Sequence, residues 1–556
     1  MRQNLLLSNM KRIITIVAFA AVAILAASCS KSRVEQMALA ENVKVECTPE
    51  VLEAIAGNIP VSVTVTCPEG YFHPKATMEV TPVLVYHGGE VAGPTYKYQG
   101  DKVKDNNKVI SKNGGSVTEK FSFAYQEGME TSYLELRSKA FYKNDVIDIP
   151  AIKVADGVNV TYQLVDLNGA YSLKDDGYQN VIHTSTEGQI MYDVNSASVK
   201  NSELRNASVN ELKQTLKETK ENERAKVTGT KIIAYASPEG GQNYNAKLSD
   251  KRAGTAEKAW AKISKGMEAS STEIQSVGQD WEGFQQAVSA SNIEDKDLIL
   301  RVLSMYSDPA VRESEIRNMS QIFTEMNKKV FPSLRRARFI TEVEYQNYSD
   351  EELKALAQER LEEIGEDGLL RLATLSEDRD EQEVLYEMAA EKFNSQKAIY
   401  NLAAIALDKG FAKEANKWLA QIDGKDADAI NAQGVLALRE GKYDKAVELF
   451  KQAGTEDAKQ NEGAVEILRG NYDAAAAKFA GATGHNAALA NILAGKYDAA
   501  EEALTGDDAM SDYLRAVIAA RKGNVADVKV YLNTAAQKDP ELGVKAAKDI
   551  EFANFR

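Results

Sequence analysis

The chain has 556 residues, of which 44% are hydrophobic and 27% are charged. This composition excludes a disordered tail protein and leaves room for about three or four domains. With 67 basic and 82 acidic residues the net charge is −15, so no basic excess neutralises phosphates, which argues against a nucleic-acid binder. Three cysteines and four histidines are too few and too scattered for a zinc or iron–sulfur protein, and we expect no cofactor.

The first segment, residues 1–28, has the pattern of a secretory signal. Lys11 and Arg12 precede an almost wholly apolar run from Ile13 to Ala27, which is shorter than the roughly 20 residues that span a bilayer. The run ends in Leu25-Ala26-Ala27-Ser28-Cys29, which resembles the lipobox of bacterial lipoproteins. The resemblance implies cleavage before Cys29 and acylation of that cysteine. An ordinary signal peptide that contains a cysteine is the alternative.

The residues after Cys29 bear on where such a lipoprotein resides. Two or more acyl chains give stable membrane anchoring, so a triacylated Cys29 would hold the protein on a membrane. Ser30 follows the cysteine instead of Asp, which by the same resemblance implies the outer membrane. Residues 30–33 lack the acidic run that resembles a surface-export signal of Bacteroidetes lipoproteins. We expect a lipid-anchored protein on the periplasmic side of the outer membrane, with residues 29–40 as a linker.

Residues 41–170 predict an all-β domain. Runs such as Thr77–Tyr86 alternate between apolar and polar residues, and turn signals such as Gly88-Gly89 separate them at intervals typical of an immunoglobulin-like sandwich. Cys47 and Cys67 each close an alternating run. In an oxidising periplasm these two cysteines are expected to form one disulfide, whereas two free thiols buried in the β core are the alternative.

Residues 185–347 predict an α+β domain. Alternation at Ile190–Val194, helical spacing at Val209–Leu216 and a second apolar run at Lys231–Ala236 begin a β-α-β-α-β order. A mostly helical insertion at about 279–336 precedes the closing strand at Phe339–Tyr345. Two aromatic residues at its start either form a docking surface or belong to the core of the insertion: Trp281 and Phe284.

Two segments of this domain resemble the OmpA-like cell-wall-binding domain. They are Tyr235–Gly240 and Tyr244–Ala253, set against the family pattern Gly-His-Thr-Asp-x-x-Gly followed by Tyr-Asn-x-x-Leu-Ser-x-x-Arg-Ala. In that family the Asp and the Arg hold the zwitterionic end of diaminopimelate in peptidoglycan. The resemblance therefore implies a peptidoglycan-binding pocket.

This pocket can be assigned residue by residue. Arg252 and Asn245 stand at their family positions, but Ser237 stands where the family has Asp. A neutral hydroxyl pairs weakly with an ammonium, and Glu239 is a carboxylate that could replace the missing charge. Either the pocket holds peptidoglycan through Ser237, Glu239, Asn245 and Arg252, or the scaffold is retained with a lapsed or altered pocket.

Residues 350–556 predict an array of helical repeats. A Gly-x-Tyr-x-x-Ala element begins at Gly441, Gly470 and Gly495, with weaker copies at Gly410 and Gly523. Gly434 and Gly463 stand seven residues before two of these glycines, and Phe450 and Phe479 occupy the large apolar position of the second helix. The pattern resembles the tetratricopeptide repeat, a family whose concave surfaces bind peptides or proteins. A degenerate helix pair is expected near Leu369–Ala390.

The negative charge is concentrated on this array. From residue 350 onward the chain has 39 acidic and 26 basic residues, so this part carries −13 of the total net charge of −15. A solvated helical exterior explains this charge, and a partner of complementary charge is the alternative.

Sequence motifs of enzymes are absent. The chain contains no Gly-x-Ser-x-Gly, no His-Glu-x-x-His and no phosphate-binding loop, so we expect no enzymatic activity. The leading hypothesis is an envelope scaffold that recruits a protein partner on its repeats. The second is a peptidoglycan tether.

Overall fold

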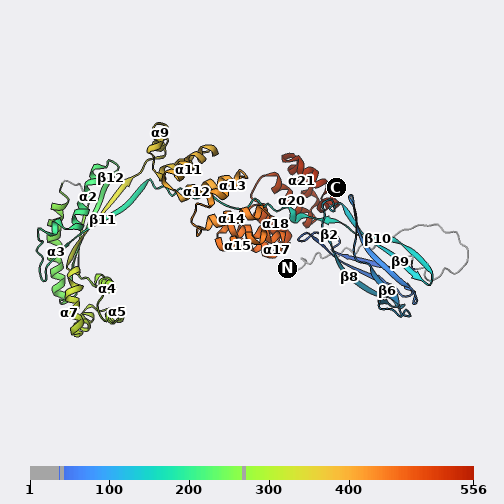
Figure 1. Ribbon diagram of the computed structural model, residues 1–556, viewed down its shortest axis with the longest axis horizontal. Coiled ribbons are helices and arrows are strands. Elements are labelled where there is room, and N and C mark those ends of the chain that lie inside the picture. The colour runs from blue at the N-terminus through green and yellow to red at the C-terminus, as the bar shows by residue number, and fades with distance from the viewer. Residues whose placement is uncertain (1–36, 38–42, 266–270, 556) are drawn as a thin grey trace, which may run out of the picture. The chain divides into compact units, whose positions relative to one another are not determined.

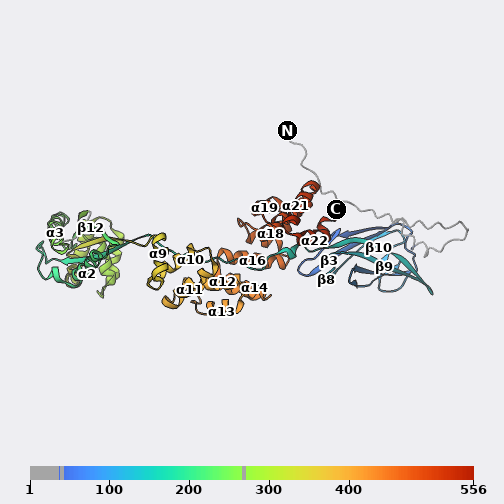
Figure 2. The same ribbon diagram turned by 90° about the horizontal axis from the view of Figure 1, so that it is seen from above.

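The computed structural model describes residues 37, 43–265 and 271–555 (Figures 1 and 2). The chain divides into two compact units. The first unit combines the residues up to Lys174 with those from Ile399 onward, and the second unit is Asp175–Ala398. None of the helices in the described ranges has the length and apolarity that crossing a membrane requires.

The N-terminal part of the first unit consists of two β-sheets. Its strands are β1 (Lys44–Thr48), β2 (Val51–Glu53), β3 (Asn58–Cys67), β4 (Thr77–Tyr86), β5 (Gly89–Ala92), β6 (Tyr96–Gly100), β7 (Lys108–Ile110), β8 (Gly115–Ala124), β9 (Ser132–Tyr142) and β10 (Asp145–Asn159). One sheet has the order β1-β3-β8, and the other has β2-β10-β9-β4-β6-β7 with β5 paired to β4. The predicted β domain is thus present, and its immunoglobulin-like assignment stays a prediction.

The alternating sequence of these strands produces the core between the sheets. Ile59, Val61 and Val63 of β3 are buried while the residues between them are more exposed. They share one apolar cluster with Leu84 of β4 and Leu134 of β9 from the other sheet. Because side chains alternate along a strand, every second residue of β3 meets the second sheet.

The register of β1 and β3 corrects the predicted disulfide. Cys47 lies opposite Val63, four residues from Cys67, which itself pairs with Gly115 of β8. At about 3.3 Å per residue this offset separates the two positions by about 13 Å along the strand, whereas a disulfide needs Cα atoms within about 7 Å. Both thiols are free and buried. The alternative of two thiols in the β core therefore holds.

The C-terminal part of the first unit is an array of antiparallel helical hairpins. Its helices are α12 (Gln396–Asp408), α13 (Ala412–Leu419), α14 (Ala427–Arg439), α15 (Tyr443–Ala453), α16 (Glu456–Leu468), α17 (Tyr472–Lys478), α18 (His485–Leu493), α19 (Tyr497–Ala503), α20 (Ala509–Lys522), α21 (Val525–Lys538) and α22 (Pro540–Lys548), followed by the 3₁₀ turn η4 (Ile550–Phe555). Each repeat glycine lies between the two helices of a hairpin, as the Gly-x-Tyr-x-x-Ala spacing predicts.

Inside the hairpins, glycines of the first helices pack against phenylalanines. A Cβ atom on Gly434 of α14 would lie 2.5 Å from Cε1 of Phe450 on α15. A Cβ atom on Gly463 of α16 would lie 2.6 Å from Cε2 of Phe479, the residue that follows α17. The missing side chain is therefore what lets the two helices of each hairpin approach around a buried phenylalanine.

The sheets and the array belong to one folded body. A single apolar cluster joins strand residues such as Leu52 and Val158 to array residues such as Ile518 and Phe552. Glu551 of η4 forms an ion pair with Arg521 of α20, with Nε and Oε1 2.8 Å apart. Its carboxylate also accepts hydrogen bonds from Asn159 and Thr161, at the end of the sheets.

The second unit contains a four-stranded sheet with helices on one face. Its strands are β11 (Val181–Met191), β12 (Ala225–Ala236), β13 (Thr272–Gln279) and β14 (Arg336–Gln346), in the order β11-β14-β12-β13. β14 is antiparallel to both neighbours, and β12 and β13 are parallel. Helices α2 (Ala207–Glu221) and α3 (Gln242–Ile263) supply Leu212 and Trp260 to the core, where Trp260 stacks on Phe339 of β14. The α+β order matches the prediction.

The predicted helical insertion lies between β13 and β14. It comprises the helices α4 (Trp281–Ala290), α5 (Lys296–Met305), α6 (Pro309–Asn318), α7 (Ser320–Lys329) and α8 (Phe331–Leu334). Phe284 is fully buried and stacks on Phe331, with ring centroids 5.6 Å apart, and Trp281 packs edge-on against it. These two aromatic residues belong to the core of the insertion and not to a docking surface.

The second unit ends in further helices. They are α9 (Asp350–Arg360), the 3₁₀ turn η3 (Leu361–Glu363), α10 (Glu366–Leu375) and α11 (Arg379–Phe393). Helices α10 and α11 are the degenerate pair expected near Leu369–Ala390. The short 3₁₀ turns η1 (Thr161–Leu164) and η2 (Glu203–Arg205) complete the elements.

Candidate functional site

An extended segment that follows the last strand of the sheets lies along the helical array (Figure 1). We call residues 165–174 the strap. The predicted sandwich domain extends to residue 170, but β10 ends at Asn159 and the strap forms neither helix nor strand. It contacts α12, α14, α16 and α18, the first helices of four hairpins, and we call this surface the asparagine face.

Three asparagines of this face bind the strap backbone in the same way. The side-chain oxygen of Asn486 accepts from the N–H of Asp166 at 2.8 Å, and its amide donates to the carbonyl of the same residue at 2.7 Å. Asn461 makes both bonds to Ala170, at 2.6 and 2.9 Å. Asn401 makes both to Lys174, at 2.7 and 3.1 Å. Each side chain thus satisfies the donor and the acceptor of one strap residue.

A fourth asparagine completes the ladder. Asn431 donates to the carbonyl of Ala170 at 2.9 Å and accepts from the amide of Asn461 at 3.0 Å. Asn401, Asn431 and Asn461 are each no more than 2% exposed. Buried amides need such partners, because a buried polar group without a hydrogen bond costs free energy.

The spacing of the contacts matches the spacing of the helices. The strap advances eight residues from Asp166 to Lys174, which is about 26 Å of extended chain at roughly 3.3 Å per residue. The first helices of the four hairpins, α12, α14, α16 and α18, are separated by three steps. At about 8–10 Å between helices that pack side by side, these three steps cover a similar length. The strap runs opposite to the array, with its first residues at α18 and its last at α12.

Strap side chains add specific contacts. The hydroxyl of Tyr171 donates to Asp408 at 2.6 Å and accepts from Arg439 at 3.2 Å. Arg439 also donates twice to the carbonyl of Asn168, at 2.8 and 2.6 Å. Burial and the bond to Asp408 raise the pKa of Tyr171 to about 12, so this hydroxyl stays protonated at neutral pH.

The end of the strap is held by charge. The ammonium of Lys174 forms ion pairs with Asp426 and, at 3.3 Å, with Asp428, and lies 5.1 Å from the ring centroid of Tyr400. Burial opposes ionisation of Asp426, but the hydrogen bond from Lys174 keeps its pKa below the usual value.

Gly169 sets the path of the strap. Its φ of +81° is in the region that favours glycine, and an added Cβ would lie 2.7 Å from Cγ2 of the buried Val435. No other residue fits here without moving either the strap or α14. The strap therefore follows the helix surface closely at this point.

The repeat pattern predicts a concave surface that binds a partner, and in the structure the chain's own strap covers the asparagine face. Apolar residues alternate along the strap at Val165, Leu167, Tyr171 and Leu173, but a strand has the same pattern, so sequence reasoning missed the contact of the strap with the array. One signal was present: Asn401, Asn461 and Asn486 each stand nine residues before a repeat glycine.

The residues predicted to bind peptidoglycan form hydrogen bonds and ion pairs with other residues of the second unit. The hydroxyl of Ser237 donates to Glu239 at 3.0 Å, and Glu239 forms a two-bond ion pair with Arg335, at 2.9 and 2.7 Å. Asn245 donates to the carbonyls of Ser237 and Gly240 and so holds the turn before α3. Three of the four predicted residues are thus brought together, and Arg335, which sequence reasoning did not assign, neutralises Glu239.

Arg252 is enclosed by protein. Its guanidinium donates to the carbonyls of Ser196, Tyr235 and Asp193, at 2.9, 2.8 and 3.2 Å, and it is 1% exposed. Burial lowers its pKa to about 10, so it remains a cation at neutral pH. In this structure the arginine binds backbone oxygens of its own domain.

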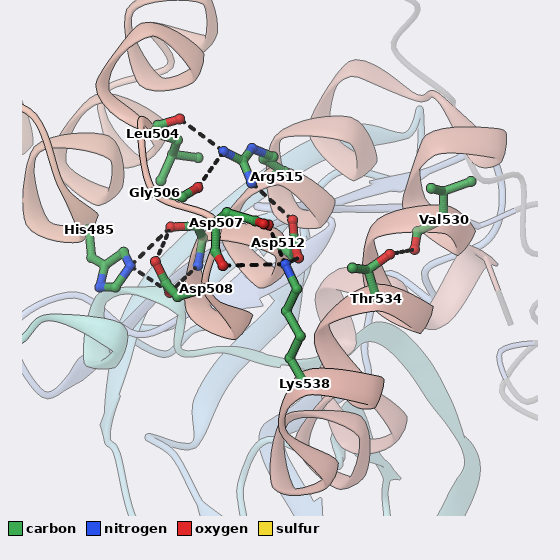
Figure 3. A network of polar contacts seen from close by, with 11 residues as sticks. His485, Leu504, Gly506, Asp507, Asp508, Asp512, Arg515, Val530, Thr534 and Lys538 are labelled. Carbon is green, nitrogen blue, oxygen red and sulfur yellow. Dashed lines mark hydrogen bonds and ion pairs between the residues drawn. The ribbon is translucent and has the colours of Figure 1, made fainter.

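A polar network at the start of α20 contains a histidine, a serine and an aspartate (Figure 3). Nε2 of His485 lies 2.9 Å from Asp508 and 3.1 Å from the hydroxyl of Ser511, and that hydroxyl donates to Asp508 at 2.7 Å. In a catalytic triad the two ring nitrogens of the histidine contact different residues. Here one nitrogen contacts both, Ser511 is 1% exposed, and Asp508 caps α20, so the network acts as a helix cap.

The same region contains paired charges. The ammonium of Lys538 contacts Asp512 at 2.8 Å and also Asp507, and Arg515 contacts Asp512 at 2.9 Å (Figure 3). These pairs join α20, α21 and the loop before α20. Cys29, the predicted lipidation site, lies outside the described residues.

No family profile and no curated protein sequence matches the chain. Among solved structures it is similar to a tetratricopeptide repeat protein from Parabacteroides merdae, at 16% identity and a TM-score of 0.27, covering 41% of this chain and 93% of that one. It is also similar to a chain of the APC/C hetero-tetramer Cut9–Hcn1, at 13% identity and a TM-score of 0.30, covering 49% of this chain and 57% of that one. Both TM-scores are low, so the description of the array rests on its own hairpins.

Proposed function

We propose that the protein is a non-enzymatic adaptor of the bacterial cell envelope, which is anchored to the periplasmic side of the outer membrane and contacts protein partners through its helical array. The observation that carries this proposal is the array of helical hairpins, because stacked hairpins offer a long surface for protein contacts. The secretory pattern of residues 1–28 and the lipobox-like sequence before Cys29 support the envelope location.

The anchor is tested by lipid labelling. Cells that express the chain are grown with radioactive palmitate, and the outer-membrane fraction should then contain the labelled protein. Cys29→Ser should abolish the label, and Cys47→Ser is the matched control that should keep it. A labelled Cys29→Ser protein, or an unlabelled wild type, would refute the anchor.

The partners are tested by crosslinking the intact protein in its own membranes, followed by affinity purification. Deleting the whole array is a poor test, because the sheets share their core with it. Charge reversal of Asp444, Asp473 and Asp498 is better suited, since these carboxylates are 99%, 88% and 94% exposed and recur once per hairpin.

If a partner of complementary charge binds the array, the triple reversal should remove its crosslinks, while reversal of the exposed Asp148 in the sheets should not. Wild type without any specific crosslinked protein would contradict the adaptor function.

A peptidoglycan tether through the second unit is the alternative. The resemblance of Tyr235–Ala253 to the OmpA-like domain supports it, whereas the ion pair between Glu239 and Arg335 means that an ammonium ligand would have to displace an arginine. Sedimentation with purified sacculi tests the tether. If wild type stays in the supernatant, the tether is wrong; if it sediments, Glu239→Gln should release it.

A further inference from the structure

We propose that the asparagine face is a peptide-binding site closed by its own strap, and that a partner segment of the same chemistry binds there when the strap is released. This inference rests on the proposed adaptor function and names the site and its regulation. It commits to one occupant, an extended segment of a partner protein that replaces residues 165–174.

The backbone contacts show what the site can recognise. Asn401, Asn461 and Asn486 each pair with one N–H and one C=O of a strap residue, and these residues are four apart. Backbone pairs of this kind are available in every extended peptide, so they provide affinity without reading sequence. Any extended segment that reaches four residues from one asparagine pair to the next meets this requirement.

The side-chain contacts define which peptides fit. Gly169 lies against Val435, so that position accepts no side chain. The next residues require an aromatic hydroxyl to meet Asp408 and Arg439, as Tyr171 does, and a cation to meet Asp426 and Asp428, as Lys174 does. The partner segment therefore has a glycine, a tyrosine two residues later, and a lysine or arginine three residues after the tyrosine.

The strap blocks this site because it is part of the same chain. A covalently linked segment competes at an effective concentration that is commonly millimolar, so a peptide added from outside binds only when the strap is weakened. The two states of the site are thus strap-bound and strap-released.

The experiment uses the full chain and a fluorescent peptide with the strap sequence, residues 165–174. Binding is measured by fluorescence anisotropy, and release of the strap is measured by trypsin cleavage after Lys174. Gly169→Val opens the strap without altering any residue of the array. Gly57→Val is the matched control, because Gly57 also has a positive φ of +75° but lies in the turn between β2 and β3, with no atom within 4 Å of an added Cβ.

We expect wild type and Gly57→Val to resist cleavage and to bind no peptide. Gly169→Val should be cleaved and should bind the peptide at least tenfold more tightly than wild type. Adding Asn461→Leu should reduce that binding at least tenfold, and a peptide with valine at its own Gly169 position should not bind. If Gly169→Val does not fold, Tyr171→Ala opens the strap more mildly and is read out in the same way.

Two results would overturn the inference. One is a wild type that binds the peptide as tightly as the opened variant, and the other is an opened, folded variant that does not bind it. Because the assay needs no cellular partner, its failure is distinct from a failure of the adaptor function, which is read from crosslinked proteins.

Discussion

At the scale of single residues, the two cysteines of the sheets show how strand register decides their chemistry. Burial raises the pKa of Cys47 to about 12 and that of Cys67 to about 11, so neither is a thiolate at neutral pH. In the Cys29→Ser chain we expect two thiols to react with a thiol reagent after unfolding without reductant, and reaction to be slow in the native state. A reduced, unfolded sample is the control and should give the same two thiols. If no thiol reacts before reduction, Cys47 and Cys67 form a disulfide, which would contradict the register of β1 and β3.

The helix cap at Asp508 gives a pH-dependent prediction at the same scale. Burial opposes its ionisation, but hydrogen bonds from Ser511 and His485 lower the pKa of Asp508 to about 2. An aspartate titrates near 3.9 in an unfolded chain, so this contribution to stability is fully present above about pH 4 and is lost as the pH falls toward 2.

Asp508→Ala should therefore lower the free energy of unfolding by about 1 kcal/mol at pH 7, with a difference that shrinks below pH 4. Urea unfolding of the full chain at several pH values measures this. Asp508→Asn keeps a capping oxygen without the charge and should lose less. A cost that is unchanged from pH 7 to pH 2.5 would show that the charge plays no part.

At the scale of elements, the hairpins depend on glycines that face phenylalanines. Gly434→Ala places a methyl group 2.5 Å from Phe450, and overpacking of this kind costs about 1–3 kcal/mol even though alanine favours a helix. The matched control is Gly254→Ala in α3, where nothing lies within 4 Å of the added Cβ and where a gain of up to about 1 kcal/mol is expected. Thermal unfolding of both variants measures the two changes in stability. Equal changes in stability would contradict the close packing of Gly434 against Phe450.

The hairpins and the strap differ in how far sequence could predict them. The repeat glycines and tyrosines carry a local periodicity, and α12–α21 follow it. The closing strand β14 was also predictable, because Phe339–Tyr345 alternates. The strap could not be predicted, because its partners lie 227 to 320 residues away and its alternating apolar residues, a pattern shared with strands, do not reveal the helices that they contact. The ion pair of Glu239 with Arg335 was hidden for the same reason, because the two residues are 96 positions apart in the sequence.

At the scale of the first unit, the sheets and the array are predicted to unfold together. Glu551 is the polar link between them, since it pairs with Arg521 and accepts from Asn159 and Thr161. Glu551→Ala leaves the arginine without its partner in a largely buried site and should cost about 3 kcal/mol.

Thermal unfolding of the full chain measures this cost, and hydrogen exchange should show faster exchange at the end of β10, far along the sequence from the substitution. Val544→Ser on α22, where the side chain is 61% exposed, is the control and should stay within about 0.5 kcal/mol of wild type. Faster exchange confined to η4 would show that the sheets and the array are independent.

The strap also has an evolutionary consequence. Repeat arrays commonly gain or lose hairpins by duplication and deletion, because each hairpin contacts only its neighbours. Here one more hairpin along the asparagine face would lengthen it by about 8–10 Å, which an extended chain covers with about three residues. A change in the number of hairpins would therefore need a matching insertion or deletion more than 200 residues away in the chain. Homologous chains are expected to vary strap length and hairpin number together or to keep both fixed.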